Sequence, residues 1–492
     1  MSREEFVVQM KNEYFAFLND ENIIELRKIG HYVGVLHPTK KHKEQLIEEI
    51  VNVELGFSPY AEKGNRGAPI KAKNLDLDER IVLKIDELRR KSINLGLINP
   101  PDDDAIKRLN TAAGTIAVAS PEFEDDGDYY SRKQVVGQLE LYKGAYFLFP
   151  LDGNKRVNIE ELVLVSLPLV EKAKVVSGDI LCCHVRKKGA LLFASEILSV
   201  NGLTPPIERF CFESEPTEFP SRKISFCAHG GNHSKTERFL DLITPVGYGQ
   251  RVLAIAPNKA KRSEFLSSIV KSLLKDSIKP FVFLCETSEE RIAEYKKVLP
   301  EEQLVATAYG DGAEQTVFAA DFILNRAKRA AETGQDVCLV VDSLDLLARA
   351  HNRTVEACKS NELSFGLSVA TLEYVKKYLA SARAFQAKGS LTIFTASADF
   401  TGDAYGDFLT GELINVANCC IYLKNEGLDD FSFDFLKSGT ERGKSLFSPA
   451  EQRLYGLISD LIFNGREFDL QKIFRKTETL QAFIEEVKKL NF

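Results

Sequence analysis

One stretch near the middle of the 492-residue chain restricts the fold more than any other. A turn-rich segment, 245–250, leads into an apolar run, 251–256, that is typical of a buried strand. A short basic segment, 257–262, follows it, and Ser263 is a good start for a helix that we expect to run to about Lys275. A strand, a tight loop and a helix in this order form the frame of a phosphate-binding loop.

The residues of that loop depart from the phosphate-binding motif. Where the motif ends in Gly-Lys-Ser/Thr, this chain has Lys261, Arg262 and Ser263. A side chain at the glycine position costs about 1–2 kcal/mol in a left-handed backbone, so Lys261 predicts a different loop path. Arg262 replaces a compact ammonium by a wide planar fork, which is not a conservative change beside a phosphate. Ser263 could still meet a Mg²⁺ ion, as in the motif.

Two interpretations of this segment stay open. Any βα unit of an α/β domain has a polar loop at this point, so the segment is either a plain connection or a nucleotide site. For the second interpretation, the candidate nucleotide-binding residues are Pro257, Lys259, Ala260, Lys261, Arg262 and Ser263.

Further apolar runs alternate with helical patterns and predict a parallel sheet with helices on both faces. These runs are 280–285, 303–307, 337–342 and 391–396. Asp342 ends one run and Glu286 follows another, and doubly wound sheets place their ligand groups at the carboxyl ends of strands. The alternative for either carboxylate is a cap on the next helix.

Six segments, in the same order and spacing, resemble the bacterial transcription termination factor Rho family between Arg238 and Gly443. They are LDLITPVGYGQR, APNKAKRS, FLCETSEE, VVDSLDLLARAHN, GSLTIFTASADFTG and LKSGTERG. The resemblance implies a RecA-like core, Mg-ATP as cofactor, single-stranded RNA as ligand and a hexameric ring.

The resemblance also assigns candidate catalytic and metal-binding residues. It implies that Asp342, with Ser263, helps to hold Mg²⁺ and that Glu286 acts on the attacking water. Lys437 stands where the family has an arginine that reaches the neighbouring subunit's nucleotide, and Thr287 stands at another arginine position. A trans arginine can contribute about 10³–10⁵ in rate, and lysine lacks its planar fork.

The RNA contacts implied by the resemblance are altered as well. In one channel loop Ala404, beside Asp403, replaces a lysine, and the other channel loop keeps one glycine of a pair, Gly366. In the barrel Phe147 matches a stacking aromatic, Tyr146 is a possible substitute for a lost one, and Phe149 stands at a basic position. The alternative is that these aromatic residues fill the barrel.

The pattern predicts a multidomain α and β protein. Its expected parts are an N-terminal helical module resembling SAP-type modules (1–56), a linker with one helix (57–135), a five-stranded OB-like or cold-shock-like barrel (136–204), a second linker (205–237), the RecA-like core (238–446) and C-terminal helices (447–492). In the first part Lys40, Lys41 and Lys43 are either phosphate contacts or an ordinary solvated helix start.

Composition limits the remaining possibilities. With a net charge of −7, the chain as a whole does not attract nucleic acid electrostatically. An RNA site must therefore be a local basic patch or a set of aromatic residues on which bases stack. The nine cysteines are scattered without a CxxC pair, which fits reduced thiols and a cytoplasmic protein. Cys227, His229 and His233 could hold a metal but lack a fourth ligand. No apolar run approaches the roughly 20 residues of a membrane span, and we expect no membrane partner.

The altered positions fall together at the phosphate loop, both arginines and the channel lysine. We therefore expect a diverged Rho-like RNA-binding protein in transcription whose ATPase and translocation are lost or reduced. It would form a homo-hexamer or a mixed ring with an active Rho, with RNA polymerase as a possible partner. The alternatives are a working RNA-dependent ATPase and an adaptor that binds only protein.

Overall fold

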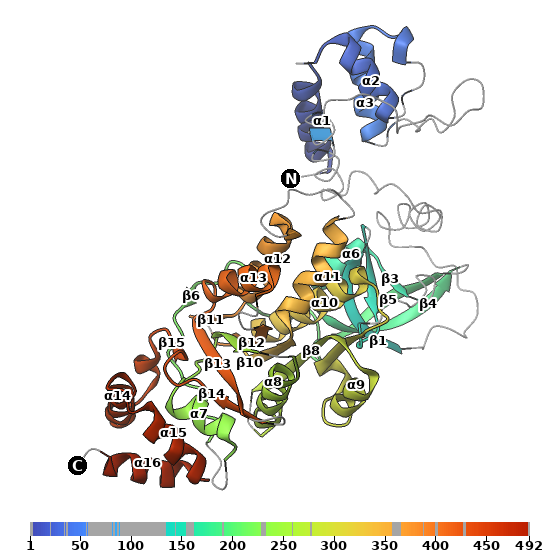
Figure 1. Ribbon diagram of the computed structural model, residues 1–492. Helices are drawn as coiled ribbons and strands as arrows, with labels where there is room; N and C mark the ends of the chain where they lie inside the picture. The colour runs from blue at the N-terminus through green and yellow to red at the C-terminus, as the bar shows by residue number, and fades with distance from the viewer. Residues whose placement is uncertain are drawn as a thin grey trace. The chain divides into compact units, whose positions relative to one another are not determined.

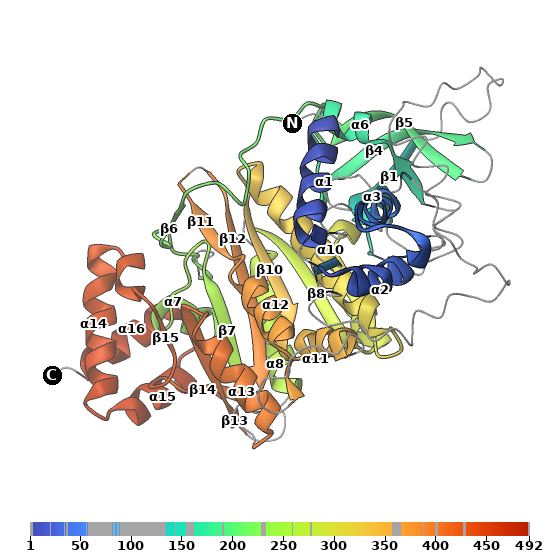
Figure 2. The same cartoon turned by 90° about the horizontal axis from the view of Figure 1, so that it is seen from above.

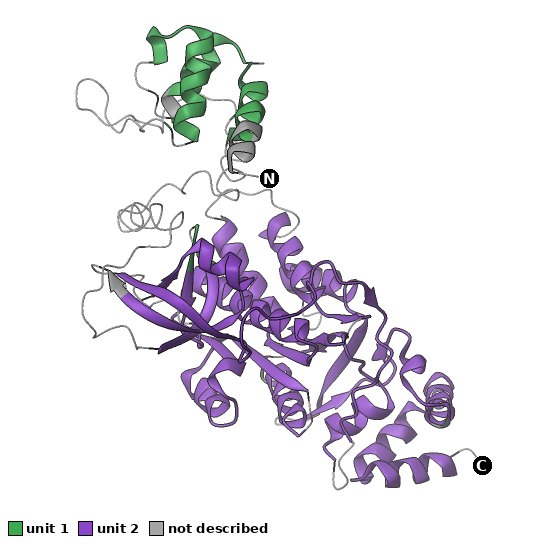
Figure 3. Cartoon of the chain, turned by 180° about the vertical axis from the view of Figure 1, so that it is seen from behind, with its two compact units in different colours: residues 1–122, 141–146 green, residues 123–140, 147–492 purple. Residues whose placement is uncertain are grey.

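The computed structural model describes residues 3–19, 21–33, 35, 38–55, 57, 81, 84, 85, 88, 134–142, 144–153, 162–188, 191–227, 233–257, 259–275, 278–356, 366–386, 388–398, 402–426 and 430–490. The chain divides into two compact units (Figure 3): unit 1 holds residues 1–122 and 141–146, and unit 2 holds residues 123–140 and 147–492. Together they form the mixed α/β multidomain protein that the pattern predicts, with a closed barrel and a largely parallel sheet.

Unit 1 is a small helical module. Its helices are α1 (Arg3–Asn19), α2 (Ile23–Val33), the 3-10 turn η1 (Pro38–Lys40) and α3 (Lys43–Glu54). The Asn22 side chain caps α2 by accepting from the backbone N–H of Ile24 and Glu25, at 2.9 and 3.0 Å. The buried core also contains Ile81, Ile85 and Leu88, which the sequence placed in the one helix of the segment 57–135. The helical module therefore extends beyond the predicted boundary at residue 56.

The barrel at the start of unit 2 has the predicted five strands. They are β1 (Gln134–Tyr142), β2 (Ala145–Phe149), β3 (Val163–Val165), β4 (Ile180–Lys188) and β5 (Leu191–Val200), and α6 (Leu167–Ala173) lies between β3 and β4 in the chain. The strands close in the order β1-β2-β3-β5-β4, with β3 parallel to β5 and β4 antiparallel to both β1 and β5. A closed barrel leaves no unpaired strand edge.

The large sheet contains six parallel strands, ordered β13-β7-β12-β10-β8-β9. They are β7 (Arg251–Ala256), β8 (Lys279–Thr287), β9 (Leu304–Ala308), β10 (Asp336–Asp342), β12 (Ser390–Ala398) and β13 (Cys419–Glu426). The five apolar runs predicted as strands are therefore strands, and their near-continuous apolar character follows from burial on both faces. Short strands extend the sheet at its margins: β6 (Thr217–Glu218), β11 (Arg383–Phe385), β14 (Asp430–Phe433) and β15 (Gly439–Thr440).

Helices cover both faces of this sheet, as Figures 1 and 2 show. One face carries α7 (Lys235–Leu242), α8 (Lys259–Leu273) and α9 (Glu289–Lys296); the other carries α10 (Ala313–Glu332), α11 (Leu344–Glu356), α12 (Val369–Leu379) and α13 (Ala404–Ile414). The chain ends in α14 (Pro449–Phe463), α15 (Glu467–Lys476) and α16 (Leu480–Lys489). Ser448 caps α14 in a capping box, and Phe483 and Val487 of α16 pack on the core.

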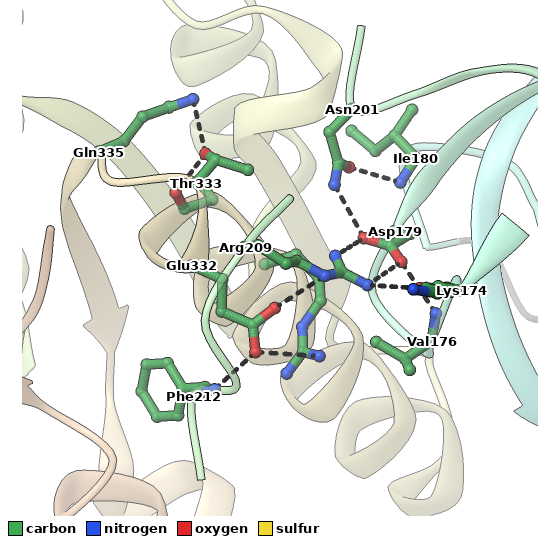
Figure 4. Close-up of polar contacts among 12 residues, drawn as sticks. Lys174, Val176, Asp179, Ile180, Asn201, Arg209, Phe212, Glu332, Thr333 and Gln335 are labelled. Atoms are coloured by element: carbon green, nitrogen blue, oxygen red, sulfur yellow. Dashed lines mark hydrogen bonds and ion pairs between the residues drawn. The ribbon is translucent and has the colours of Figure 1, made fainter. Parts of the chain in front are cut away.

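Buried polar groups join the barrel to α10. Arg209 lies between Asp179 of the barrel and Glu332 at the end of α10 (Figure 4), with Nη2 2.8 Å from one Asp179 oxygen and Nε 3.4 Å from Glu332. Nearby, the fully buried Arg326 donates from Nε to the Gln138 side chain at 2.6 Å. The Gln138 amide donates in turn to Glu140 at 2.6 Å, and burial raises the pKa of Glu140 to about 7.

Candidate nucleotide site

Three predicted residues meet at the carboxyl edge of the large sheet. Ser263 in α8 follows β7, Asp342 ends β10, and Glu286 lies near the end of the neighbouring β8. The Ser263 hydroxyl donates to Asp342 Oδ2 at 2.6 Å, and both side chains are buried. In the phosphate-binding motif, a serine hydroxyl and a strand-end carboxylate lie together in this way and bind Mg²⁺.

The phosphate loop itself is replaced by helix. We expected α8 to begin at Ser263, but it begins at Lys259, so only Pro257 and Asn258 separate it from β7. Alanine, lysine and arginine are strong helix formers, and no glycine in 259–262 favours a left-handed turn. The different path predicted from Lys261 is therefore confirmed. Fewer backbone N–H groups remain to surround a phosphate than in a full loop.

Arg262 points into the protein and not into an open loop. Its guanidinium is 3.2 Å from Asp345 Oδ2, and the two side chains are only 7% and 11% exposed. Asp345 also accepts a hydrogen bond from the Ser343 hydroxyl. The residue in the position of the phosphate-binding lysine thus forms a buried ion pair within its own chain.

Two further arginines neutralise the other carboxylates of the site. Arg291 of α9 lies 3.7 Å from Asp342 Oδ2, on the carboxylate expected to help hold a metal. Arg353 of α11 forms an ion pair with Glu286, the carboxylate expected to act on water. Each acidic group therefore already faces a cation of the same chain.

Glu286 also has an unusual backbone. Its φ is 44°, in the left-handed region that costs a residue with a Cβ about 1–2 kcal/mol. The pairing of β8 with β9 shifts in register between Leu284 and Thr287, and the Glu286 N–H donates to the Thr307 hydroxyl at 3.1 Å. The bulge turns Glu286 out of the regular strand at the edge where ligand groups collect.

Mg-ATP does not fit this arrangement. A phosphate chain would meet the start of α8 where the motif has a loop. Arg262, which stands in the position of the motif's lysine, is held by Asp345. A divalent ion at Asp342 would compete with the guanidinium of Arg291. Among the residues that the structure describes, no group of three His, Cys, Asp or Glu side chains could hold a metal, and His229 of the proposed Cys227 cluster lies outside them.

Lys437 lies in a different segment of the core from these residues. It is exposed in the turn between β14 and β15, with its Nζ 5.8 Å from the centre of the Tyr422 ring on β13. The backbone N–H of Lys437 donates to Asp434 Oδ1 at 3.0 Å, which fixes the turn. A role toward a neighbouring subunit stays a prediction.

The predicted RNA-contacting residues divide into two groups by exposure. Phe149 is 2% exposed and packs against Phe318 and Phe322 of α10, with ring centres 5.0 and 6.3 Å apart. Phe147 is 5% exposed. Inclusion of Phe149 among the RNA-contacting residues was wrong, because a ring covered by α10 cannot stack on a base. Its partners lie on α10, so the structure places the ring between the barrel and α10 and not in the barrel interior.

The other candidates lie at the surface. Tyr146 is half-buried, and Gly366 is exposed with a φ of 79°. Asp403 and Ala404 begin α13, where the Arg349 guanidinium pairs with Asp403 at 2.6 Å. Asp403 is therefore an internal ion-pair partner in this chain. Of the two predicted channel loops, residues 361–365 and Thr401 lie outside the described residues.

Lys41 and Lys43 have partners within unit 1. Lys41 pairs with Glu49, and Lys43 donates to the Asn19 carbonyl at 2.9 Å. These contacts favour the ordinary helix start over a phosphate site. No helix among the described residues is long and apolar enough to cross a membrane.

Sequence reasoning missed the partners that neutralise the site: Asp345, Arg291 and Arg353. Asp345 follows Asp342 by three residues, in the first turn of α11, so its proximity was available from the sequence. Arg291 and Arg353 come from α9 and α11, on opposite faces of the sheet, and no local pattern signals that both turn toward one edge.

The chain is similar to proteins named transcription termination factor Rho. It is 26% identical to that of Streptobacillus moniliformis over 432 residues, covering 85% of this chain and 96% of the relative. It is also 26% identical to that of Aquifex aeolicus over 497 residues, covering 97% of both chains.

A solved ATPase of a bacterial type III secretion system matches 60% of this chain and 94% of its own, with 18% identity and a TM-score of 0.45. No family model matches the chain. The end-to-end similarity to Rho proteins confirms the predicted resemblance and supports a diverged member of the Rho family.

Proposed function

We propose that this chain is an RNA-binding, Rho-related subunit that acts in transcription termination or its regulation and has lost most or all nucleotide hydrolysis and translocation. The observation that carries the loss is the buried Arg262–Asp345 ion pair. Freeing Arg262 for a phosphate would leave Asp345 buried without its partner, and breaking such a pair costs about 3–5 kcal/mol. ATP would have to supply that free energy before any catalysis.

The RecA-like core would then form the subunit contacts of a ring in place of hydrolysing ATP. The proposed form is a hexameric ring of this chain or a mixed ring with an active Rho, in which Lys437 faces the next subunit. Its exposure supports this role. RNA would bind at the barrel through Tyr146, with RNA polymerase as a further proposed partner.

The test is phosphate release by the full-length protein with Mg-ATP, with and without poly-pyrimidine RNA. We expect no release above that of a Glu286→Gln variant, which serves as the control for contaminating ATPases. RNA-stimulated turnover that disappears in Glu286→Gln would refute the proposed loss. Analytical ultracentrifugation of the chain alone and mixed with an active Rho tests the ring.

Two other functions each have one observation in their favour. Ser263, Asp342 and Glu286 converge at one edge, which favours a working ATPase that opens its ion pairs on binding nucleotide. Burial of Phe147 and Phe149 favours a protein-binding adaptor that has lost RNA. Filter binding with pyrimidine-rich RNA separates the adaptor from the other two.

A further inference from the structure

A pocket lies between α7, β14 and α15, lined by none of the residues of the candidate nucleotide site. Its volume is about 300 Å³, within the range of small-molecule sites. Three cations and three aromatic rings contribute to its wall, and none of the lining residues that the structure describes is acidic. These six are Lys235, Arg238, Arg475, Phe433, Phe435 and Phe474.

Arg238 is the unusual member of this wall. Its side chain is buried, with the residue 6% exposed, and no described carboxylate lies within ion-pair distance of it. Its Nη1 donates to the Phe474 carbonyl and the Thr477 hydroxyl, both at 3.2 Å, while its Nε is buried without a hydrogen-bond acceptor. Buried arginines are ordinarily paired with a carboxylate or another oxyanion.

The surroundings do not compensate this charge. The neighbouring Glu237 is committed to Lys275, at 2.9 Å, and to the cap of α7. Glu478 acts on Arg238 only at longer range, and burial lowers the pKa of the Arg238 guanidinium. Arg238 is therefore a cation that folding has removed from water and left without an anionic partner in the described chain.

The rest of the pocket adds positive charge and apolar surface. Half-buried Lys235 donates to the Phe431 carbonyl at 2.7 Å, which holds its ammonium at the pocket, and exposed Arg475 lies at the rim. The Arg238 guanidinium carbon lies 4.6 Å from the centre of the Phe474 ring, so the ring supports the fork from one side. A planar fork held in place is suited to bidentate recognition of a phosphate group.

We infer that this pocket binds the phosphate group of a small phosphorylated molecule, with Arg238 as its central contact. The site is distinct from the candidate nucleotide site at the carboxyl edge of the sheet. It does not depend on the proposed loss of hydrolysis, since none of its residues takes part in that argument.

The experiment is isothermal titration of the full-length protein with pyrophosphate, and with inorganic phosphate as a smaller probe. We expect saturable binding that falls about 10- to 100-fold in Arg238→Met, the loss expected for a hydrogen bond to a charged group. Lys472→Met is the control, because Lys472 is exposed on α15, the helix of Phe474 and Arg475, and does not line the pocket. It should bind as the unmodified protein does.

Three further variants complete the test. Lys235→Met and Arg475→Gln should each weaken binding, and they keep the test valid if Arg238→Met fails to fold. Arg262→Met should leave binding unchanged, whereas a loss in this variant would place the anion at the candidate nucleotide site and overturn the inference. Equal binding by Arg238→Met and the unmodified protein, or binding of RNA oligonucleotides without any of pyrophosphate, would overturn it as well.

Discussion

Replacement of Arg209 by methionine tests how the barrel is held on the core. Arg209 is 9% exposed at its side chain, and its two carboxylate partners, Asp179 and Glu332, are 0% and 2% exposed. Methionine keeps much of the apolar stem but removes the charge, so two buried carboxylates lose a cation. Breaking a buried pair from one side costs about 3–5 kcal/mol.

The structure places the expected loss at the lower end of that range. Asp179 keeps hydrogen bonds from the Val176 N–H and the Asn201 amide, both at 2.8 Å. Glu332 keeps Arg329 at 3.3 Å and the Phe212 N–H at 2.8 Å. We therefore expect Arg209→Met to lower the free energy of unfolding by about 3 kcal/mol.

The assay is urea unfolding followed by far-ultraviolet circular dichroism, with hydrogen exchange of peptides from β4, β5 and α10 to localise the effect. Arg222→Met is the matched control: Arg222 pairs with Asp336 at 2.8 Å but is 59% exposed, and such surface pairs contribute about 0–1 kcal/mol. An Arg209→Met loss no larger than that of Arg222→Met would refute the reasoning. A double-mutant cycle with Asp179→Asn should show a coupling of about 1–3 kcal/mol.

Three other changes have defined outcomes. Because folding raises the pKa of Glu140 from 4.5 to about 7, the stability contributed by its protonated form is fully present below pH 4.5 and is lost as the pH rises through 7. The free energy of unfolding should therefore fall by about 3 kcal/mol over that window. Urea titrations at several pH values should show that Glu140→Gln removes this pH dependence. Tyr146→Ala should weaken single-stranded RNA binding about 5- to 100-fold in filter assays, whereas Phe149→Leu should lower thermal stability and leave RNA affinity unchanged. The double change Lys261→Gly with Arg262→Lys should increase affinity for a fluorescent ATP analogue, because glycine weakens the helix start by about 1 kcal/mol and lysine gives up the guanidinium contact with Asp345. An unchanged affinity would contradict the role assigned to these two residues.

Much of the fold was predictable because its signals are local. A buried parallel strand must be apolar along its whole length, so the runs ending at Ala256 and Asp342 were recognisable without any tertiary information. The cap at Ser448 and the spacing of Phe483 and Val487 are equally local. Such patterns describe only the backbone's immediate surroundings.

The sequence by itself determined the strands of the sheet and barrel, the Rho-like order of motifs and the loss of glycine at Lys261. Only the tertiary structure decided what the charged side chains do. It turned Arg262 toward Asp345, brought Arg291 and Arg353 to the same edge from helices on opposite faces, and buried Phe149 against α10. The reason is physical: apolar periodicity is set by burial over a few residues, whereas the partner of a charge depends on which distant elements the folded chain brings within a few ångströms.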